Sequence, residues 1–504
     1  MRRLIFARGG LLSQVRSAEP LVVAAAGVSA AGASVAEVAA PASAAGSRPA
    51  SLLGQIAWAI CDGARSPYNV LVNIFVFGAY FSTVVIPDPV RGQTVWSFVS
   101  CVGALLVAIG APILGAIADA GGRRKPWLFG CLVLGAPCMA SLWFATPHMT
   151  SGLLWIMLAL IGGTLCFEYS AVFCSAMLPN VAPRGRLGFL SGLGYSLGNL
   201  FGVFLFLFYL LAWDRNPHPL FGLKVSGHEP ERAVGILAAV WLVVFYLPMF
   251  IWTPDSPASS RSIPQAIRTG WRNLLETLTH ARRYRNTTLF LIARLLYNEG
   301  FVVIMLFTSV VAAGVLHWTP RMLISMGLIN SVVATLSGLF AGWLDKQAGT
   351  KAATLTFVCG CLVANIVVCS ITPDTVLFLK LHGAALQAAS AGAGIFPFPT
   401  LPDRVFLVTQ NLLAFFVTGG LVTSRTLMAK LSPPAMLNEF FGLYAVSGNA
   451  TSFVGPLAIG IVTAAFASQR AGVAVGIAFL LAGIVLMAPV REAIPSSSAS
   501  EGRG

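Results

Sequence analysis

The chain has little charge for its length. Only 10% of its 504 residues are Asp, Glu, Lys or Arg, while 57% are hydrophobic. Soluble proteins average about 25% charged and about 45–50% apolar residues. The mean hydropathy of +0.80 points the same way. This shortage of charge excludes an ordinary soluble domain and predicts an integral membrane protein.

Signatures of catalysis and of metal binding are also missing. The sequence has no phosphate-binding G-x-x-x-x-G-K-[ST] loop and no H-E-x-x-H zinc motif, so it gives no sign of ATP hydrolysis or zinc chemistry. Its six histidines are scattered over expected loops and linkers, and almost all of the nine cysteines lie within apolar segments without metal or redox spacing. We therefore expect no enzyme activity, no metal site and no cofactor.

The basic residues are not arranged for nucleic acid. The 32 Lys and Arg residues outnumber the 18 Asp and Glu residues and give a net charge of +14. A nucleic-acid-binding face would collect them in one stripe, but here they separate apolar segments. Cytoplasmic loops of membrane proteins are enriched in Lys and Arg. The pattern predicts a lipid bilayer rather than a nucleic acid as partner, and both termini on the cytoplasmic side.

Long apolar segments dominate the chain. A transmembrane helix needs about 20 mostly apolar residues, and the sequence contains twelve such segments. They cover residues 67–87, 93–118, 126–146, 151–176, 190–213, 232–252, 287–315, 321–344, 352–371, 403–424, 440–466 and 470–490. Residues 375–402 are expected to form an external loop, because Pro397, Pro399 and Pro402 oppose a spanning helix. We predict an all-α membrane protein with twelve transmembrane helices in two pseudo-symmetric six-helix bundles.

The predicted organisation has five parts. They are a largely disordered N-terminal extension over 1–64, ending in a short interfacial helix over 52–64; an N-terminal bundle over 65–253; a cytoplasmic linker over 254–286; a C-terminal bundle over 287–490; and a disordered tail over 491–504. In the linker, Ile267, Trp271 and Leu274 recur at helical spacing opposite Arg268 and Arg272. This pattern is typical of an amphipathic helix on the inner membrane surface, although a calmodulin-binding or nucleic-acid-binding helix would share it.

One charged turn occurs twice. Between the second and third apolar segments, glycines permit a tight turn and an acid can anchor the following bases. A weaker copy with the same glycine spacing runs over 342–351, between the eighth and ninth segments. Such a repeat indicates two related halves. The first copy contains Gly115, Asp119, Gly122, Arg123 and Arg124.

This turn and its copy resemble the loop motif of the major facilitator superfamily. Further segments resemble the vacuole effluxer-like branch of that superfamily, which is related to fungal vacuolar proteins that export amino acids during autophagy. These segments lie within 68–93, 168–192, 296–300, 424–429 and 439–445. The chain departs from the superfamily motif at Ala120, where a base usually follows the acid.

The resemblance implies secondary transport by alternating access, in which two bundles rock around a central cavity. It implies a small-molecule solute, with amino-acid efflux coupled to protons as the inherited expectation. It also implies that Asp119 contacts Arg123 and the start of the eleventh helix, which would favour an outward-open state; alternatively, Asp119 caps its own loop. We expect a monomer in a bacterial inner (plasma) membrane.

Charged and amide side chains inside the apolar segments are candidate proton or substrate sites, because a charge at the bilayer centre costs about 2.5–3.5 kcal/mol. Either acid among them can bind a proton or a substrate amine, and Arg294 can pair with Glu168 or with a substrate carboxylate. The alternatives are structural ion pairs, interhelical hydrogen bonds and snorkelling of Arg294 to the membrane surface. The candidates are Glu168, Glu299, Asn298, Arg294, Asn69, Asn73 and Asn330.

Two hypotheses for function follow. The first is a proton-linked carrier of small solutes, either amino acids or another small organic solute. The second is a transporter-like sensor or scaffold that moves no solute. A transport assay separates them.

Overall fold

The computed structural model describes most of the chain from Ala50 to Arg491. The described residues are 50–121, 123–183, 186–214, 216, 218–255, 284–380, 398–432, 443–444, 447–448 and 451–491. All of them belong to the unit Pro41–Gly504. The predicted disordered extension, most of the predicted linker helix and most of the predicted tail lie outside the described residues.

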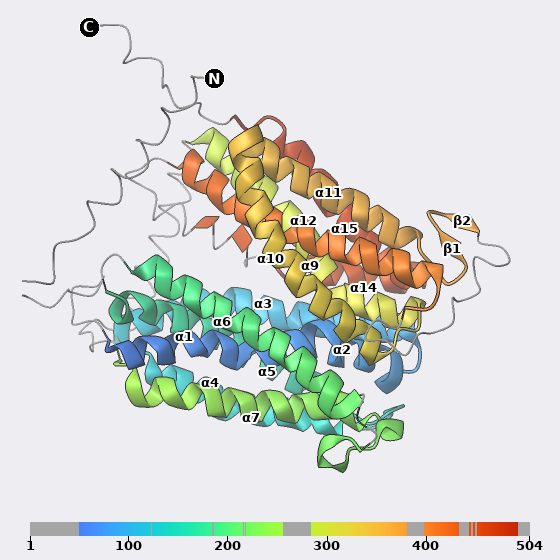
Figure 1. The fold of residues 1–504 in the computed structure, drawn as a ribbon, viewed down its shortest axis with the longest axis horizontal. Helices are drawn as coiled ribbons and strands as arrows, with labels where there is room; N and C mark the ends of the chain where they lie inside the picture. Colours follow the sequence, from blue (N-terminus) through green and yellow to red (C-terminus); the bar gives the residue numbers. More distant parts are fainter. Residues whose placement is uncertain are drawn as a thin grey trace, which may run out of the picture. The chain divides into compact units, whose positions relative to one another are not determined.

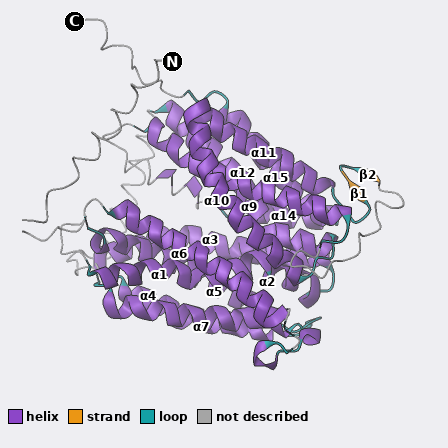
Figure 2. Cartoon of the chain, in the orientation of Figure 1, coloured by secondary structure: helices purple, strands orange, loops and turns teal. Residues whose placement is uncertain are grey.

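The described chain is almost entirely helical (Figures 1 and 2). Its N-terminal half contains α1 Leu52–Pro67, η1 Tyr68–Phe75, α2 Phe77–Tyr80, η2 Phe81–Val85, α3 Pro89–Gly121, α4 Lys125–Ala140, η3 Ser141–Phe144, α5 Leu153–Val181, α6 Leu187–Phe208, η4 Tyr209–Asp214, η5 Leu220–Gly222, η6 Val225–Gly227 and α7 Glu229–Trp252. Its C-terminal half contains α9 Arg285–Val315, α10 Pro320–Ala348, α11 Thr350–Ser370, β1 Thr375–Val376, β2 Leu379–Lys380, α12 Leu401–Leu431, α14 Val454–Phe466 and α15 Gln469–Met487.

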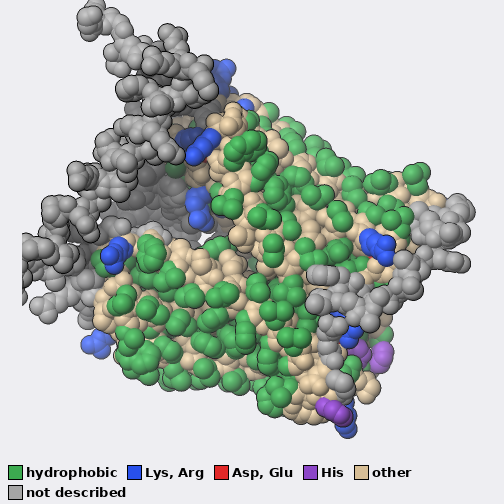
Figure 3. All heavy atoms as spheres, viewed as in Figure 1, with side chains coloured by type: hydrophobic (Ala, Val, Ile, Leu, Met, Phe, Trp, Pro, Cys, Tyr) green, Lys and Arg blue, Asp and Glu red, His purple; other side chains and the backbone are tan. Residues whose placement is uncertain are grey.

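The helices form two bundles that follow the two halves of the sequence. In the first, α1 packs against α6 and α7, and α4 packs against α5; in the second, α9 packs against α15, and α11 against α12. Among the described residues, 11 helices are long and apolar enough to cross a membrane, and α14 is a shorter apolar helix within the eleventh of the twelve segments expected from the sequence, 440–466. Lys and Arg side chains border a broad apolar band on the face drawn in Figure 3. The prediction of an all-α membrane protein with two six-helix bundles is confirmed.

The first span begins earlier than predicted. The expected short interfacial helix over 52–64 is not a separate element, because Leu52–Val85 forms one apolar helical segment of 34 residues that is long enough to cross a membrane. Its beginning is packed inside the bundle: the Trp58 indole N–H donates to the Cys174 carbonyl at 2.8 Å, and the Thr253 hydroxyl donates to the Gly54 carbonyl at 2.8 Å. The helix continues past Pro67 in π-helical turns. The missing N–H of Pro67 leaves the Gly63 carbonyl without its helical donor, and the Trp241 indole N–H donates to that carbonyl at 3.1 Å.

The predicted external loop contains a small hairpin in its described part. The strands β1 and β2 pair antiparallel, and residues 381–397 lie outside the described chain. The following helix starts with a capping box, in which the side chains of Thr400 and Asp403 each accept from the other residue's backbone N–H. Pro402 fits here because the first turn of a helix does not need its missing N–H.

The two ends of the bundles differ. We call the end with Thr253 and Tyr284 the linker end, and the opposite end, with β1 and β2, the hairpin end (Figure 1). Hydrogen bonds join the two bundles at the hairpin end. The Gln93 amide donates to the Thr463 hydroxyl at 2.8 Å and to the Gln469 carbonyl at 3.0 Å.

Two further contacts strengthen this closure. Arg321 at the start of α10 forms an ion pair with Asp214 at the end of η4, at 2.5 Å. The Ser309 hydroxyl on α9 donates to the Ile74 carbonyl on η1. The bundles are therefore bonded to each other from the hairpin end down to the level of Ile74.

Candidate functional site

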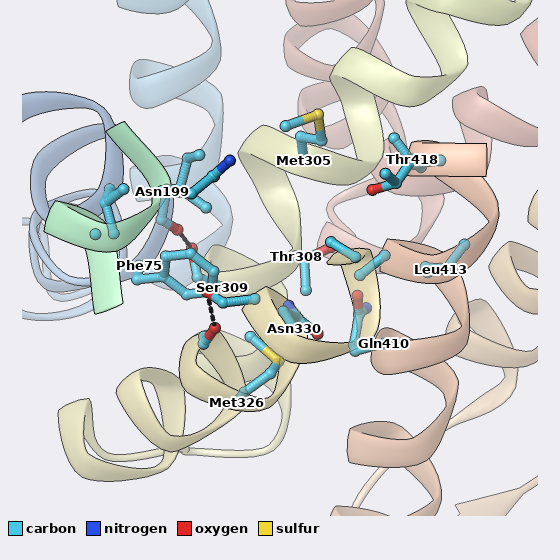
Figure 4. Close-up of a pocket in the computed structure, with 18 of the residues that line it drawn as sticks. Phe75, Asn199, Met305, Thr308, Ser309, Met326, Asn330, Gln410, Leu413 and Thr418 are labelled. Atoms are coloured by element: carbon cyan, nitrogen blue, oxygen red, sulfur yellow. Dashed lines mark hydrogen bonds between the residues drawn. The ribbon is translucent and has the colours of Figure 1, made fainter. Parts of the chain in front are cut away.

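A cavity of about 240 Å³ lies between the two bundles. The N-terminal bundle lines it with residues of η1 and α6, and the C-terminal bundle with residues of α9, α10 and α12. Its position is set by the contact of Ser309 with Ile74, since both residues belong to its lining. Figure 4 shows Phe75 on one side of it and Asn330, Thr308 and Gln410 on the other.

The N-terminal wall of the cavity is largely apolar. Val70, Ile74, Phe75 and Phe206 form much of it, and the rings of Phe75 and Phe206 meet edge to face with centroids 5.1 Å apart. Asn199 adds one amide to this wall. Such a surface suits the apolar face of an organic molecule.

The C-terminal wall carries the polar groups. The hydroxyls of Thr308 and Ser331 donate to carbonyls of their own helices, Ile304 at 2.5 Å and Gly327 at 3.0 Å, so these donors are already used. The amides of Asn330 and Gln410 are different: Asn330 Oδ1 and Gln410 Nε2 are buried atoms without a hydrogen-bond partner within the described structure.

Unpartnered buried amides are rare because each costs free energy, about 1–3 kcal/mol. Gln410 is only 3% exposed and lines the cavity. The described lining includes no Asp, Glu, Lys, Arg or His. The cavity therefore offers neutral hydrogen-bonding groups to whatever fills it.

Asn330 is the one sequence-predicted candidate found among the described lining residues. Asn69 and Asn73 lie half-buried on η1, beside the lining residues Val70 and Ile74. Sequence reasoning missed Gln410, which lies within the predicted span over 403–424. Gln410 could have been found as a polar residue within an apolar segment, the same signal that identified Asn330.

The predicted site residues on α9 lie close together, but they bind the eleventh predicted span, 440–466, instead of lining the cavity. Arg294 is buried, and its Nη1 donates to the Tyr444 carbonyl and to the Ser447 hydroxyl, both at 2.6 Å. Its guanidinium also lies 3.5 Å from the centre of the Tyr444 ring, a cation–π contact. These partners fix Arg294 inside the bundle, so it does not snorkel.

The neighbours of Arg294 bind the same span. The Asn298 amide donates to the Gly448 carbonyl at 3.1 Å. Glu299, 1% exposed, accepts from the Thr451 hydroxyl at 2.7 Å and from the Gly455 backbone N–H at 2.9 Å. The carboxylate is thus satisfied by neutral donors within its own bundle.

Glu168 has a different cation beside it from the one predicted. Arg65 on α1 lies close enough to act electrostatically on Glu168, while Arg294 is bonded to the eleventh span. Arg65 also forms an ion pair with Asp62, one turn earlier in the same helix, and lies 5.3 Å from the centre of the Phe167 ring. The sequence analysis placed Arg65 outside the first span and so missed this cluster.

The two arginines belong to a repeat that the sequence analysis did not find. Residues 64–69 read Ala-Arg-Ser-Pro-Tyr-Asn, and residues 293–298 read Ala-Arg-Leu-Leu-Tyr-Asn. They lie in the first helix of each bundle. The tyrosines bind equivalent places: Tyr68 donates to the Leu160 carbonyl on α5 at 2.9 Å, and Tyr297 shares a 2.6 Å hydrogen bond with Ser424 on α12. Comparing the two halves position by position would have revealed the repeat.

The predicted gating loop is described only in part. Gly115 and Asp119 lie in the last turns of α3, without described side chains, and Gly122 lies outside the described residues. Arg123 is exposed. The backbone N–H of Arg124 donates to Asp255 Oδ1, just beyond α7, at 2.9 Å. The loop is therefore held by its own bundle on the linker side, and the predicted contacts of Asp119 stay a prediction.

The weaker copy of the loop is fully described. Asp345 accepts from Lys430 Nζ on α12 at 3.3 Å and from the Thr350 hydroxyl. Both partners lie in the C-terminal bundle. The acid of this copy therefore links helices of one bundle at the linker end.

Residues 184–493 match the protein family described as "Vacuole effluxer Atg22 like". The match covers more than half of the chain. The chain belongs to this family. It is therefore a multi-pass membrane protein of the transporter class, as the sequence resemblance predicted.

Curated relatives agree with this membership. An uncharacterized MFS-type transporter of Bacillus subtilis, YxiO, is 24% identical over 443 residues, which cover 86% of this chain and 94% of YxiO. Autophagy-related protein 22-2 of Neosartorya fischeri is 25% identical over 317 residues, covering 59% of this chain and 47% of the fungal protein. The chain thus spans about half the length of this fungal relative and nearly all of the bacterial one.

Solved structures share the fold. A D-xylose-proton symporter superposes with a TM-score of 0.61 at 13% identity, covering 88% of this chain and 99% of the symporter chain. The nucleoside transporter NupG superposes with a TM-score of 0.57 at 12% identity, covering 86% and 97%. Both likenesses establish a major facilitator fold.

Proposed function

We propose that this protein moves a small organic solute across a membrane by alternating access. The observation that carries the proposal is the cavity between the bundles, which hydrogen bonds close at the hairpin end. In an alternating-access carrier, such contacts must break when the site opens to the other side. The contact between Gln93 and Thr463 is therefore the proposed gate at the hairpin end.

The proposed driving force is a proton gradient. The cluster of Asp62, Arg65 and Glu168 supports this, because a cation shared between two carboxylates can exchange partners when one of them binds a proton. Glu299 is the second candidate proton site. One proton is worth about 2.3 kcal/mol per 100 mV, so a single site is enough for moderate accumulation or export.

The proposed setting is a bacterial inner membrane, with the protein acting as a monomer and both termini in the cytoplasm. The linker end then faces the cytoplasm and the hairpin end faces outward. In this orientation the closed hairpin end makes the described state inward-facing. The proposed role of Asp119, with Arg123, is to hold the opposite, outward-open state.

Amino acids are the solute that the family resemblance suggests for efflux. Another small organic solute is the alternative, and a sensor or scaffold that moves nothing is the alternative in a different class. The sensor hypothesis would leave the cavity without a transported occupant.

The test is transport by the purified full chain in liposomes. Labelled amino acids, sugars, nucleosides and amides are offered with and without an imposed pH gradient. We expect saturable uptake of at least one solute that increases with the gradient. Absence of uptake for every solute, with folding verified by thermal unfolding, would reject the carrier and support the sensor.

A blocking variant ties uptake to the cavity. Ala334 lines the cavity on α10, so Ala334→Trp should abolish uptake by filling it. Leu339 lies on the same helix, is 73% exposed and is not part of the described lining of the cavity. Leu339→Trp should therefore keep full uptake, and equal loss in both variants would contradict the assignment of the cavity.

A further inference from the structure

We infer that the solute of this cavity is uncharged and offers both a hydrogen-bond donor and an acceptor to the amides of Gln410 and Asn330. The inference rests on the proposed transport function and specifies its substrate class. It favours a neutral amide, polyol or nucleoside-like solute over an amino acid.

The amide pair is the first observation. Gln410 Nε2 and Asn330 Oδ1 are both buried and unpartnered, and both residues line the same cavity from neighbouring helices (Figure 4). A buried donor and a buried acceptor without partners cost free energy, so a solute that satisfies both of them is favoured. Each side-chain amide has both a donor and an acceptor end, so a solute with both functions satisfies the pair whichever way the amides point.

The absence of charge is the second observation. No described residue of the lining carries a charge. An ion that enters such a cavity loses its hydration without gaining a counter-charge. An amino acid brings both an ammonium and a carboxylate, so it would lose hydration at two groups. An uncharged solute avoids this penalty.

The charged groups near the cavity have partners of their own. On the N-terminal side, Arg65 is paired with Asp62, and neither residue belongs to the described lining. Arg294 is bonded to Tyr444 and Ser447, and Glu299 to Thr451 and Gly455. These contacts hold the eleventh span and leave the α9 charges outside the cavity lining. We therefore assign the charged residues to helix packing and proton coupling, and solute recognition to the amides of Gln410 and Asn330.

Size and shape are the third observation. The cavity of about 240 Å³ is smaller than the roughly 300–1,000 Å³ of ordinary ligand pockets. The edge-to-face rings of Phe75 and Phe206 form an apolar wall. The solute should therefore be small, with an apolar or flat face toward α6 and η1 and its polar groups toward α10 and α12.

The experiment compares solute classes and then variants. The purified full chain is screened by thermal unfolding with neutral amides, polyols and nucleosides, with zwitterionic amino acids, and with organic acids and amines. The strongest stabiliser of each class is then tested as a labelled solute in liposomes. We expect a neutral solute to be bound and transported with at least about tenfold higher affinity than any charged or zwitterionic one.

Two isosteric variants test the amides. Gln410→Leu and Asn330→Leu should each lower the affinity for the neutral solute about tenfold, the usual effect of losing one hydrogen bond. Neither should lower the unfolding temperature of the solute-free protein, because each removes an unsatisfied group. A merely structural role would lower that temperature instead.

Asn411 provides the matched control. It follows Gln410 on α12, donates to the Leu407 carbonyl at 2.8 Å and is not part of the described lining. Asn411→Leu should leave solute affinity unchanged. Preferential transport of an amino acid, or undiminished affinity in both amide variants, would overturn the inference while leaving the carrier intact. Absence of transport for every class would overturn the carrier and the inference together.

Discussion

The first helices of the two bundles carry the same Ala-Arg-x-x-Tyr-Asn sequence but use it differently. On α9, Arg294 and Asn298 are bonded to the eleventh span. On α1, Arg65 is paired with Asp62 in its own helix and lies beside Glu168. One copy fixes helices to each other, whereas the proposed role of the other is to hold a charge that changes partner when a proton binds. A duplicated segment can thus keep its chemistry and divide its roles.

The residues that flank the repeat account for the difference. Glu299 follows the C-terminal copy and accepts from Thr451 and Gly455, which adds two bonds to the eleventh span. Val70 follows the N-terminal copy and lines the cavity. The C-terminal copy is therefore surrounded by protein, while the N-terminal copy borders the cavity.

Removal of the two arginines should give the largest contrast. Arg294→Leu deletes two charge-assisted hydrogen bonds and a cation–π contact, and we expect a loss of about 3–5 kcal/mol in the free energy of unfolding. Arg65→Leu should cost only about 1–2 kcal/mol, since the Asp62 side chain is 36% exposed and can be hydrated, and Glu168 can bind a proton once the cation is gone. Chemical unfolding in detergent measures both. Equal losses would show that the two copies have the same role.

The two glutamates should separate coupling from packing. Glu168→Gln removes the charge beside Arg65, so we expect gradient-driven uptake to be lost while solute exchange persists. Glu299→Gln keeps one oxygen to accept from the Gly455 N–H and presents its NH2 group to the Thr451 hydroxyl, which can accept. Losing the charge on the acceptor should lower stability by about 1–2 kcal/mol. Liposome uptake with and without a pH gradient measures the effect of Glu168→Gln, and chemical unfolding measures the effect of Glu299→Gln. Unchanged driven uptake in both variants would remove both as coupling sites.

The tyrosines should behave alike where the arginines differ. Tyr68→Phe loses the bond to Leu160, and Tyr297→Phe loses the bond to Ser424. Each change should cost about 1 kcal/mol of unfolding free energy, and neither should alter the dependence of uptake on pH. If Tyr68→Phe uncoupled transport from the pH gradient, Tyr68 would belong to the proposed coupling cluster of Asp62, Arg65 and Glu168.

The sequence predicted the fold well because hydropathy and basic loops act locally along the chain. The first span was misplaced, since Arg65 and Pro67 mark a boundary by local rules while the packing of Trp58 extends the helix to Leu52. The site was predicted less well. Asn330 was found as a polar residue in a span, but Gln410 joins it only because α10 and α12 meet, and helix rotation cannot be derived from composition.

The smallest predicted effect is a pH dependence of stability, which we expect from the N-terminal bundle and not from the C-terminal bundle at the hairpin end. In the N-terminal bundle, His228 lies just before α7 and hydrogen-bonds Glu231 at 3.2 Å. This bond, opposed by partial desolvation and helped by the carboxylate charge, raises the pKa of His228 above its ordinary value. In the C-terminal bundle, Asp403 has Thr400 and Trp318 as partners, and neither partner titrates near neutral pH.

The sign of the pH effect follows from the raised pKa. Because folding favours protonated His228, its stabilisation is complete below the unfolded pKa of about 6.5 and is lost as pH rises through the folded pKa. The side chain is 38% exposed, so solvent screening limits the effect to a few tenths of a kcal/mol. His228→Gln should remove this decline above about pH 6.5, as measured by unfolding at several pH values. Trp318→Phe should leave it in place, since that contact does not titrate. A decline that survives His228→Gln would have to arise from another titrating group.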